Sequence, residues 1–261
     1  MPDTPVLTST RNPRVRAAAS LSRRRERVAR GQHLAEGPRA VAEALAAGQV
    51  VEVLLTPDRR GELEIPAGVE VTVVADHVLA AVADAASPQG IVAVVATPLA
   101  ALGDAMTGDL VLVLDRVADP GNVGTIVRTA DAAGASGVVV TVGSADPFGP
   151  KAARAAVGST YHLPIATDVR LEDVRALAAA TGRRLLGLDA GAPNSVFDLD
   201  PAGGPVALVL GSEAHGLAEA EVLDGTLAIP IAGKAESLNV GAAAAVAAFA
   251  VARTLRDGAT R

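Results

Sequence analysis

The sequence predicts an α/β chain in two parts, a small domain followed by a larger one built around a parallel sheet. Two observations support this prediction. Short apolar runs alternate with helix-like segments along the chain, and in the second half these runs are almost continuously apolar, which is typical of strands buried on both faces. With 261 residues, 50% of them hydrophobic, the chain can bury a large core.

The sequence of the first part predicts a small α/β layer domain over residues 1–97. Strand-like runs cover residues 50–55, 69–74 and 90–96, and helix-like segments cover 37–48 and 76–84. Gly37 and Pro38 mark a helix start, and Gly48 marks its end. Residues 98–108 contain Pro98, Gly103 and Gly108 with weak periodicity. We therefore place a linker there and the second domain at 109–261.

The sequence of the second domain predicts alternating strands and helices. We expect strands at 110–115, 137–142, 184–189, 206–211 and 227–231, and helices at 124–133, 150–157, 171–180 and 240–255. Ligands of parallel sheets bind at the carboxyl ends of the strands. The ends of the strands are therefore the places to look for chemistry.

Composition excludes several classes of protein. The chain has no cysteine, which excludes disulfides, zinc–cysteine clusters, iron–sulfur clusters and thiol nucleophiles, and we expect no metal. No apolar run reaches the roughly 18 residues of a membrane span, and the N-terminus lacks the apolar region of a signal peptide. We expect a soluble cytoplasmic protein with no membrane partner.

The charge is unevenly distributed along the chain. The formal net charge is -6, but residues 11–30 hold 8 of the 23 basic residues and 1 of the 29 acidic residues. The remaining chain has 15 basic and 28 acidic residues. All basic residues before Lys151 are arginines, which suit bidentate phosphate contacts. The segment therefore predicts an RNA contact, with a solvated helix face as the alternative. Because only 2% of the residues are aromatic, base stacking on aromatic rings is not the expected main mode.

The first of three glycine-bearing motifs, residues 119–135 (DPGNVGTIVRTADAAGA), follows the strand at 110–115. Asn122 lies where it could cap a helix that starts near Gly124. Arg128 lies one turn further on. An ion pair with Asp131 is one interpretation of Arg128. The other is phosphate binding together with free N–H groups at the helix N-terminus.

The second motif, residues 207–217 (ALVLGSEAHGL), runs from a buried strand into Gly211, Glu213 and Gly216. Gly211 would let another chain or a flat ligand approach the backbone. Glu213 requires a cation or a set of donors, because an unpaired buried charge is costly. His215 more simply faces solvent or caps a turn than acts in catalysis.

The third motif, residues 229–246 (IPIAGKAESLNVGAAAAV), joins a strand end to a long alanine-rich helix. Ser237 and Asn239 fit a helix start, so a capping role is open for each. The alanine-rich helix is suited to close packing against another helix, such as one from a second subunit.

These three motifs, in this order, resemble those of the SpoU/TrmH branch of the SPOUT methyltransferases. The resemblance covers residues 108–256 and includes the connecting stretch 151–165 (KAARAAVGSTYHLPI). Residues 34–45 (LAEGPRAVAEAL), which follow the arginine-rich segment, resemble the ribosomal-protein-L30e-like substrate domain of the rRNA-directed members. One departure is Gly241, where the family often has alanine or a small hydroxyl residue.

The resemblance implies an S-adenosylmethionine-dependent RNA ribose 2′-O-methyltransferase. It implies a SPOUT domain with a deep trefoil knot near the C-terminus and a homodimer formed through that domain. The expected substrate is rRNA, in particular 23S rRNA, with tRNA as the alternative. Two rival classes are an RNA-binding protein that keeps the fold without catalysis and a dinucleotide-dependent oxidoreductase. The latter lacks support because no glycine-x-glycine-x-x-glycine fingerprint follows a strand.

The resemblance also assigns roles to individual residues. The cofactor would lie against Leu210, Gly211, Ile229, Ile231, Gly233 and Leu238. Arg128 would be the catalytic arginine, with Asn122, Glu213, Ser237 and Asn239 shaping the site. For RNA binding we expect Arg11, Arg14, Arg23, Arg24, Arg25, Arg27, Glu36 and Arg39. Since arginine is a poor base, we expect Arg128 to hold the RNA and stabilise the developing alkoxide, which leaves the proton acceptor open.

Overall fold

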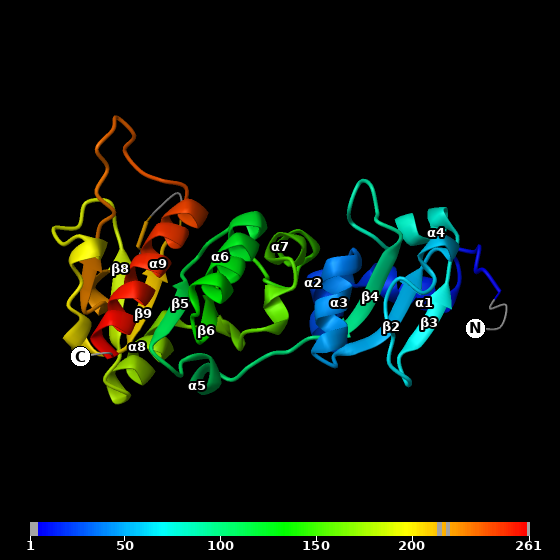
Figure 1. Cartoon of the computed structure of the whole chain (residues 1–261), viewed down its shortest axis with the longest axis horizontal. Helices are drawn as coiled ribbons and strands as arrows, with labels where there is room; N and C mark the ends of the chain where they lie inside the picture. The colour runs from blue at the N-terminus through cyan, green and yellow to red at the C-terminus, as the bar shows by residue number, and fades with distance from the viewer. Residues whose placement is uncertain (1–4, 213–215, 218–219, 260–261) are drawn as a thin grey trace. The chain divides into compact units, whose positions relative to one another are not determined.

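The computed structural model describes residues 5–212, 216–217 and 220–259 (Figure 1). The chain forms two compact units: one comprises Met1–Pro98 with Phe148–His162, and the other comprises Leu99–Pro147 with Leu163–Arg261. The segment Phe148–His162 thus packs with the first unit although the chain has already entered the second. The domain boundaries at residues 97 and 109 stay a prediction, and the linker between them contains a short helix, α5 (Leu102–Ala105).

The first unit is built on a four-stranded mixed sheet in the order β1-β4-β2-β3. Strand β4 runs antiparallel to β1 and β2, whereas β2 and β3 are parallel. The strands are β1 (Gln32–Glu36), β2 (Val50–Leu55), β3 (Glu70–Val73) and β4 (Ile91–Ala96). The helices are α1 (Pro13–Ser20), α2 (Arg24–Arg30), α3 (Pro38–Ala46), α4 (Asp76–Ala80) and α7 (Pro150–Ala156).

Each face of this sheet has its own core, because successive side chains of a strand point to opposite faces. Leu54 packs with the apolar side chains of α1 and α4, whereas Val53 and Leu55 pack with those of α3. The arginine-rich segment forms two helices, α1 and α2. The buried Arg27 of α2 donates from Nη1 to the carbonyls of Leu21 (2.9 Å) and Ser22 (2.8 Å), which lie just after the end of α1, and so ties the two helices together.

The segment that contains α7 is held to β1 by a buried polar cluster. His33 has no exposed surface, and its Nε2 lies 3.0 Å from the Tyr161 hydroxyl. Its Nδ1 lies 3.2 Å from Thr97 Oγ1. The ring of His33 also lies 5.1 Å from that of Phe148. Burial raises the pKa of the Tyr161 hydroxyl well above its usual range, so Tyr161 stays neutral and able to donate.

The second unit contains a six-stranded sheet in the order β10-β8-β9-β5-β6-β7, and every pairing in it is parallel. This confirms the predicted parallel sheet. The strands are β5 (Leu110–Leu114), β6 (Gly137–Thr141), β7 (Ile165–Val169), β8 (Arg184–Leu188), β9 (Val206–Leu210) and β10 (Gly225–Leu227). The remaining helices are α6 (Pro120–Ala133), α8 (Leu171–Ala180) and α9 (Val240–Ala259).

Helices cover both faces of this sheet within the second unit (Figure 1). Val111 and Val113 of β5 share a core with apolar residues of α5 and α8. Helices α6 and α9 pack against each other and against β5. The alanines of α9 that face inward, such as Ala244 and Ala248, are fully buried, and their small size lets α9 lie close to α6.

Several elements differ from their predicted bounds, and α6 and β10 show why. Helix α6 begins at Pro120 rather than near Gly124, because Asp119 and Pro120 form a capped start. Strand β10 (Gly225–Leu227) shares only Leu227 with the predicted strand 227–231. Beyond Leu227, Ala228 forms a bridge with Ser195 rather than with β8, and Pro230 has no N–H with which to continue a ladder. None of the helices that the structure describes is long and apolar enough to cross a membrane.

Candidate active site

A cavity of about 490 Å³ opens in the second unit, beside the carboxyl ends of β8 and β9. Five of the six residues predicted to hold a cofactor line it: Leu210, Gly211, Ile229, Ile231 and Leu238. Gly233 is not among the described lining residues. The cavity therefore combines the second and third motifs, which are separated in the sequence by a further strand.

The second motif folds back on itself at the cavity wall. A Cβ on Gly211 would collide with the Gly216 carbonyl, and the Gly216 N–H donates to the Ser212 carbonyl at 2.8 Å. The expected reason for Gly211 was the approach of a ligand or another chain. The structure gives a different reason: the backbone of Gly216, later in the same motif, packs against Gly211 and leaves no room for a side chain there. Glu213 and His215 lie outside the described residues.

The third motif caps the long C-terminal helix. Asn239 Oδ1 accepts from the N–H groups of Gly241 (2.9 Å) and Ala242 (3.3 Å). The capping role considered for Asn239 is therefore present. Ser237 lines the cavity beside Leu238, whose apolar side chain is 41% exposed. An exposed leucine at a cavity is available to an apolar or planar ligand surface.

The first motif meets the third through its asparagine. Asn122 is not the helix cap: Asp119 takes that role, accepting from the N–H groups of Gly121 (2.7 Å) and Asn122 (3.1 Å). The free N–H groups expected at this helix start are thus partly satisfied by Asp119. The side chain of Asn122 is turned to Asn239, whose Nδ2 donates to Asn122 Oδ1 at 3.3 Å.

Gly241 lies where α9 begins against α6. A Cβ there would come within 3.1 Å of Asn239 Oδ1 and 3.3 Å of Thr125 Cγ2. The departure from the family pattern at Gly241 therefore concerns packing as well as helix propensity, because the absent side chain lets the two asparagines approach.

Arg128 extends from α6, six residues beyond Asn122, and its side chain is exposed. The two interpretations of Arg128, an ion pair with Asp131 and phosphate binding, both stay predictions. Because the side chain is exposed, a ligand can reach the guanidinium from solvent.

The predicted RNA-binding residues fall into two groups in the first unit. Arg11, Arg23, Arg24, Arg25 and Arg39 are exposed. Arg14 is exposed but pairs with Glu70 and lies 4.0 Å from Glu52. Arg27 and Glu36, in contrast, bury their charged groups in contacts with the protein itself, which gives both a structural role.

Asp189 is a cavity residue that we did not select from the sequence. It directly follows β8, lines the cavity, and is the single charged side chain among the described lining residues. Its Oδ1 accepts from the Gly191 N–H at 2.7 Å, which fixes the carboxylate at the turn. The signal was present, because an acidic residue and a glycine follow an apolar strand here as in the second motif.

Comparison with known proteins identifies the family. Residues 109–249 match the model of the SpoU rRNA Methylase family, and residues 12–93 match the MRM3-like substrate binding domain. The chain belongs to the SpoU rRNA methylase family. It is 34% identical to the 23S rRNA (guanosine(2553)-2′-O)-methyltransferase RlmP of Bacillus subtilis, over 92% of this chain and 96% of that protein.

Solved structures of methyltransferases match almost the whole chain. An AdoMet-bound rRNA methyltransferase from Sinorhizobium meliloti matches with a TM-score of 0.86 and 31% identity, covering 96% of this chain and 98% of that one. The AdoMet complex of AviRb from Streptomyces viridochromogenes matches with a TM-score of 0.80 and 31% identity, over 93% and 98% of the two chains. The predicted family, α/β fold, activity and cofactor class are confirmed.

Proposed function

We propose that this protein transfers a methyl group from S-adenosylmethionine to a ribose 2′-hydroxyl of 23S rRNA. The observation that carries the proposal is the convergence of the three motifs. The second and third line one cavity at the carboxyl edge of the parallel sheet, and the first joins them through Asn122 and Asn239. The similarity to a 23S rRNA 2′-O-methyltransferase over 92% of this chain supports the choice of RNA.

The cavity suits the cofactor in size and chemistry. Its volume of about 490 Å³ lies within the usual range for small-molecule sites. Leu210, Ile229, Ile231 and Leu238 offer apolar surface and backbone groups, and Asp189 offers one carboxylate to a ligand that carries positive charge. When bound, S-adenosylmethionine supplies a methyl group activated by the attached sulfonium.

The protein must also make the ribose oxygen nucleophilic. We assign Arg128 to this step, because its exposed guanidinium can bind the RNA phosphate and stabilise negative charge as the 2′-oxygen loses its proton. Arginine itself keeps its protons at neutral pH, so Arg128 acts by charge and hydrogen bonding. Asn122, Ser237 and Asn239 position the cavity edge around that oxygen. Glu213 keeps the role that the resemblance implies, as a prediction.

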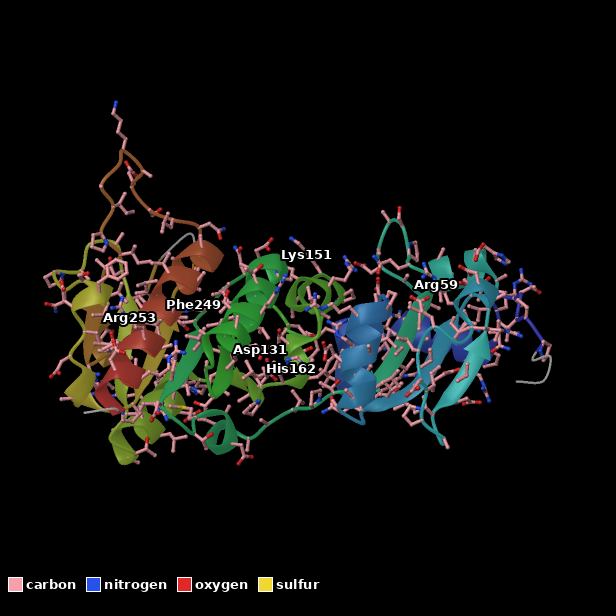
Figure 2. All side chains as sticks on the ribbon, viewed as in Figure 1. Arg59, Asp131, Lys151, His162, Phe249 and Arg253 are labelled. Atoms are coloured by element: carbon pink, nitrogen blue, oxygen red, sulfur yellow. The ribbon has the colours of Figure 1, made fainter. Side chains whose placement is uncertain are left out.

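The proposal includes a homodimer formed through the C-terminal domain. Along α9, Val246 is 38% exposed and Phe249 is 47% exposed, beside Phe197 at 57%. These side chains line a groove of about 520 Å³, and Figure 2 labels Phe249 and Arg253 along the helix. Large apolar side chains gathered in one exposed patch are typical of an interface. We expect light scattering to give a dimer and Phe249→Glu to give a monomer; a wild-type monomer at micromolar concentration would refute this.

The trefoil knot and a cytoplasmic location also belong to the proposal. Support for the knot comes from the parallel sheet shared with the family and from the packing of α9 against α6, β5 and β9. An rRNA substrate supports a cytoplasmic location.

The proposed activity is tested by incubating unmodified 23S rRNA and tRNA with labelled S-adenosylmethionine. We expect label in 23S rRNA and a linkage resistant to alkali at one nucleotide, because 2′-O-methylation removes the hydroxyl that cleaves the chain. Label in tRNA alone would identify tRNA rather than 23S rRNA as the substrate. Cofactor binding without transfer to either RNA would favour the non-catalytic alternative.

A further inference from the structure

The loop that follows β5 carries an arginine in a backbone conformation that arginine rarely adopts. Arg116 has a φ of +56°, in the left-handed region where a side chain is unfavourable and glycine is preferred. Such strain persists only where the surrounding structure holds it, and it is concentrated at functional sites. Arg116 is therefore a candidate for a role that glycine could not fill.

Hydrogen bonds to the loop after β6 fix the backbone on both sides of this arginine. Thr141 Oγ1 accepts from the Arg116 N–H at 3.3 Å and donates to Asp115 Oδ1 at 2.9 Å. Ser144 Oγ accepts from the Val117 N–H at 3.1 Å. The left-handed conformation is thus set by the protein itself, before any ligand binds.

A buried carboxylate and a glycine orient the side chain of Arg116. Its Nε lies 3.5 Å from Asp115 Oδ2, and the side chain of Asp115 is 4% exposed whereas that of Arg116 is 42% exposed. A Cβ on Gly143, in the loop after β6, would come within 3.1 Å of Arg116 Cγ, so the arginine stem lies across this glycine. The guanidinium is planar and carries five N–H donors. A group oriented in advance loses little conformational freedom when it binds a ligand.

Arg116 lies at the same edge of the sheet as the cofactor cavity. The Asp115 N–H donates at 2.8 Å to the carbonyl of Leu210, which lines that cavity. Neighbouring strands are about 4.8 Å apart, so the loop after β5 borders the cavity at the end of β9. The same loop leads into α6, where Asn122 meets Asn239. A nucleotide whose ribose lies at the cavity therefore brings its base or its phosphate to this loop.

The charge of the two loops favours a base over a phosphate at Arg116. Residues 115–119 and 141–147 together hold three aspartates and one arginine. These carboxylates repel a phosphate, whereas a base is neutral. Arginine only donates hydrogen bonds, so it suits a base edge that presents two adjacent acceptors. Guanine has such an edge, formed by O6 and N7.

We propose that Arg116 recognises the base of the nucleotide to be methylated, through O6 and N7 of a guanine. The proposal rests on the proposed function and extends it from the reaction to the identity of the acceptor nucleotide. Proteins read unpaired RNA bases on this edge as well as on the Watson–Crick edge. Arg116 thus selects the nucleotide, whereas Arg128 acts in the chemical step.

The test replaces Arg116 with the residue that its backbone conformation favours. Arg116→Gly removes the guanidinium without straining the loop. Asp168, which is exposed and has a φ of +58°, provides a matched control through Asp168→Gly. The full-length proteins are incubated with S-adenosylmethionine and four 23S rRNA transcripts that differ only in the base of the methylated nucleotide. We expect the wild type to prefer guanosine, and Arg116→Gly to lower kcat/KM for that transcript about tenfold. The other three transcripts should change little, and Asp168→Gly should match the wild type.

Two further measurements separate a base contact from other roles of Arg116. The melting temperature should be kept, because relief of the strained φ offsets the lost ion pair. The slope of log RNA affinity against log salt should also be kept, because no phosphate contact is lost.

Three results would overturn the proposal. They are an equal loss for all four transcripts with a lower melting temperature, a reduced salt slope, and a wild type that does not prefer guanosine. Failure of the proposed function is distinct, since the wild type would then transfer no methyl group to any transcript. The relative affinities of Arg116→Gly and the wild type for the four transcripts test the base contact in that case too.

Discussion

The two units of this protein use sheets of different kinds, and the difference decides what their sequences reveal. In the second unit all strand pairings are parallel, and β5, β6 and β9 are buried along their whole length. In the first unit β4 runs against both of its neighbours. A parallel sheet has one edge where all carboxyl ends meet, and binding sites gather there. A mixed sheet has no such edge.

The two units therefore differ in how well the sequence selects their site residues. At the parallel edge, reading the residues after each strand leads to the cavity lined by Leu210, Gly211 and Ile229. In the first unit, the choice of arginines by charge alone mixes exposed Arg25 with buried Arg27. Local sequence identified three motifs with candidate site residues in the second unit, whereas in the first unit it offered a basic segment and one shorter motif, residues 34–45.

The largest effect should come from removing the proposed alkoxide stabiliser. Arg128→Ala should lower methyl transfer at least about a hundredfold, the scale of losing one such donor, with cofactor affinity and melting temperature unchanged. Arg170, exposed at the start of α8, provides the control through Arg170→Ala, which should keep full activity. Equal turnover of Arg128→Ala and the control would remove Arg128 from the mechanism. It would also weaken the argument that the active site lies at the carboxyl ends of the parallel strands.

Much of the second unit was accessible from sequence because each element carried its own local signal. The predicted helix 171–180 has its observed bounds, and the predicted strand 110–115 differs from β5 by one residue. The start of α6 was missed although Asp119 and Pro120 carry the usual signal, because the glycines after them were taken for a longer turn. Asp189 was missed because the predicted strand 184–189 includes it, whereas β8 ends at Leu188 and leaves Asp189 in the turn after the strand.

Contacts between distant residues could not be predicted in the same way. The bond between Asn239 and Asn122 joins residues 117 positions apart, and only the packing of α9 on α6 brings them together. The segment around Tyr161 belongs to the first unit through its bond to His33, 128 positions away. Side chains at such positions appear in the sequence as an ordinary cap and an ordinary tyrosine.

A matched pair of variants on α2 tests whether the arginines of the first unit divide into buried structural residues and exposed ones. Arg27→Ala removes two charge-assisted hydrogen bonds to the carbonyls of Leu21 and Ser22. It should lower the free energy of unfolding by about 2 kcal/mol. Arg25 is 92% exposed, and Arg25→Ala should leave stability within about 0.5 kcal/mol. Urea unfolding of the two variants measures both values, and equal stabilities would contradict a structural role for Arg27.

A smaller effect is expected at the cofactor cavity from Asp189→Asn. An exposed carboxylate near a cation contributes up to about 1 kcal/mol, so S-adenosylmethionine should bind about threefold to fivefold more weakly by calorimetry. S-adenosylhomocysteine, which lacks the sulfonium charge, separates two modes of contact: an equal loss for both ligands indicates a hydroxyl or ammonium contact, and a larger loss for S-adenosylmethionine indicates the sulfonium. Asp198→Asn, at an exposed position outside the cavity lining, should change neither affinity.

The smallest effect is expected for a single exposed arginine in RNA binding. If Arg25 contacts a phosphate, Arg25→Ala should weaken 23S rRNA binding about twofold to fivefold at physiological salt. It should also reduce the slope of log affinity against log salt by about 0.7 to 1, since each neutralised phosphate releases counterions. Because Arg25→Ala should not alter stability, a change in slope can only report the lost contact. An unchanged slope would assign α2 to a solvated face, and the contact of the first unit with RNA would then have to come from residues outside α2.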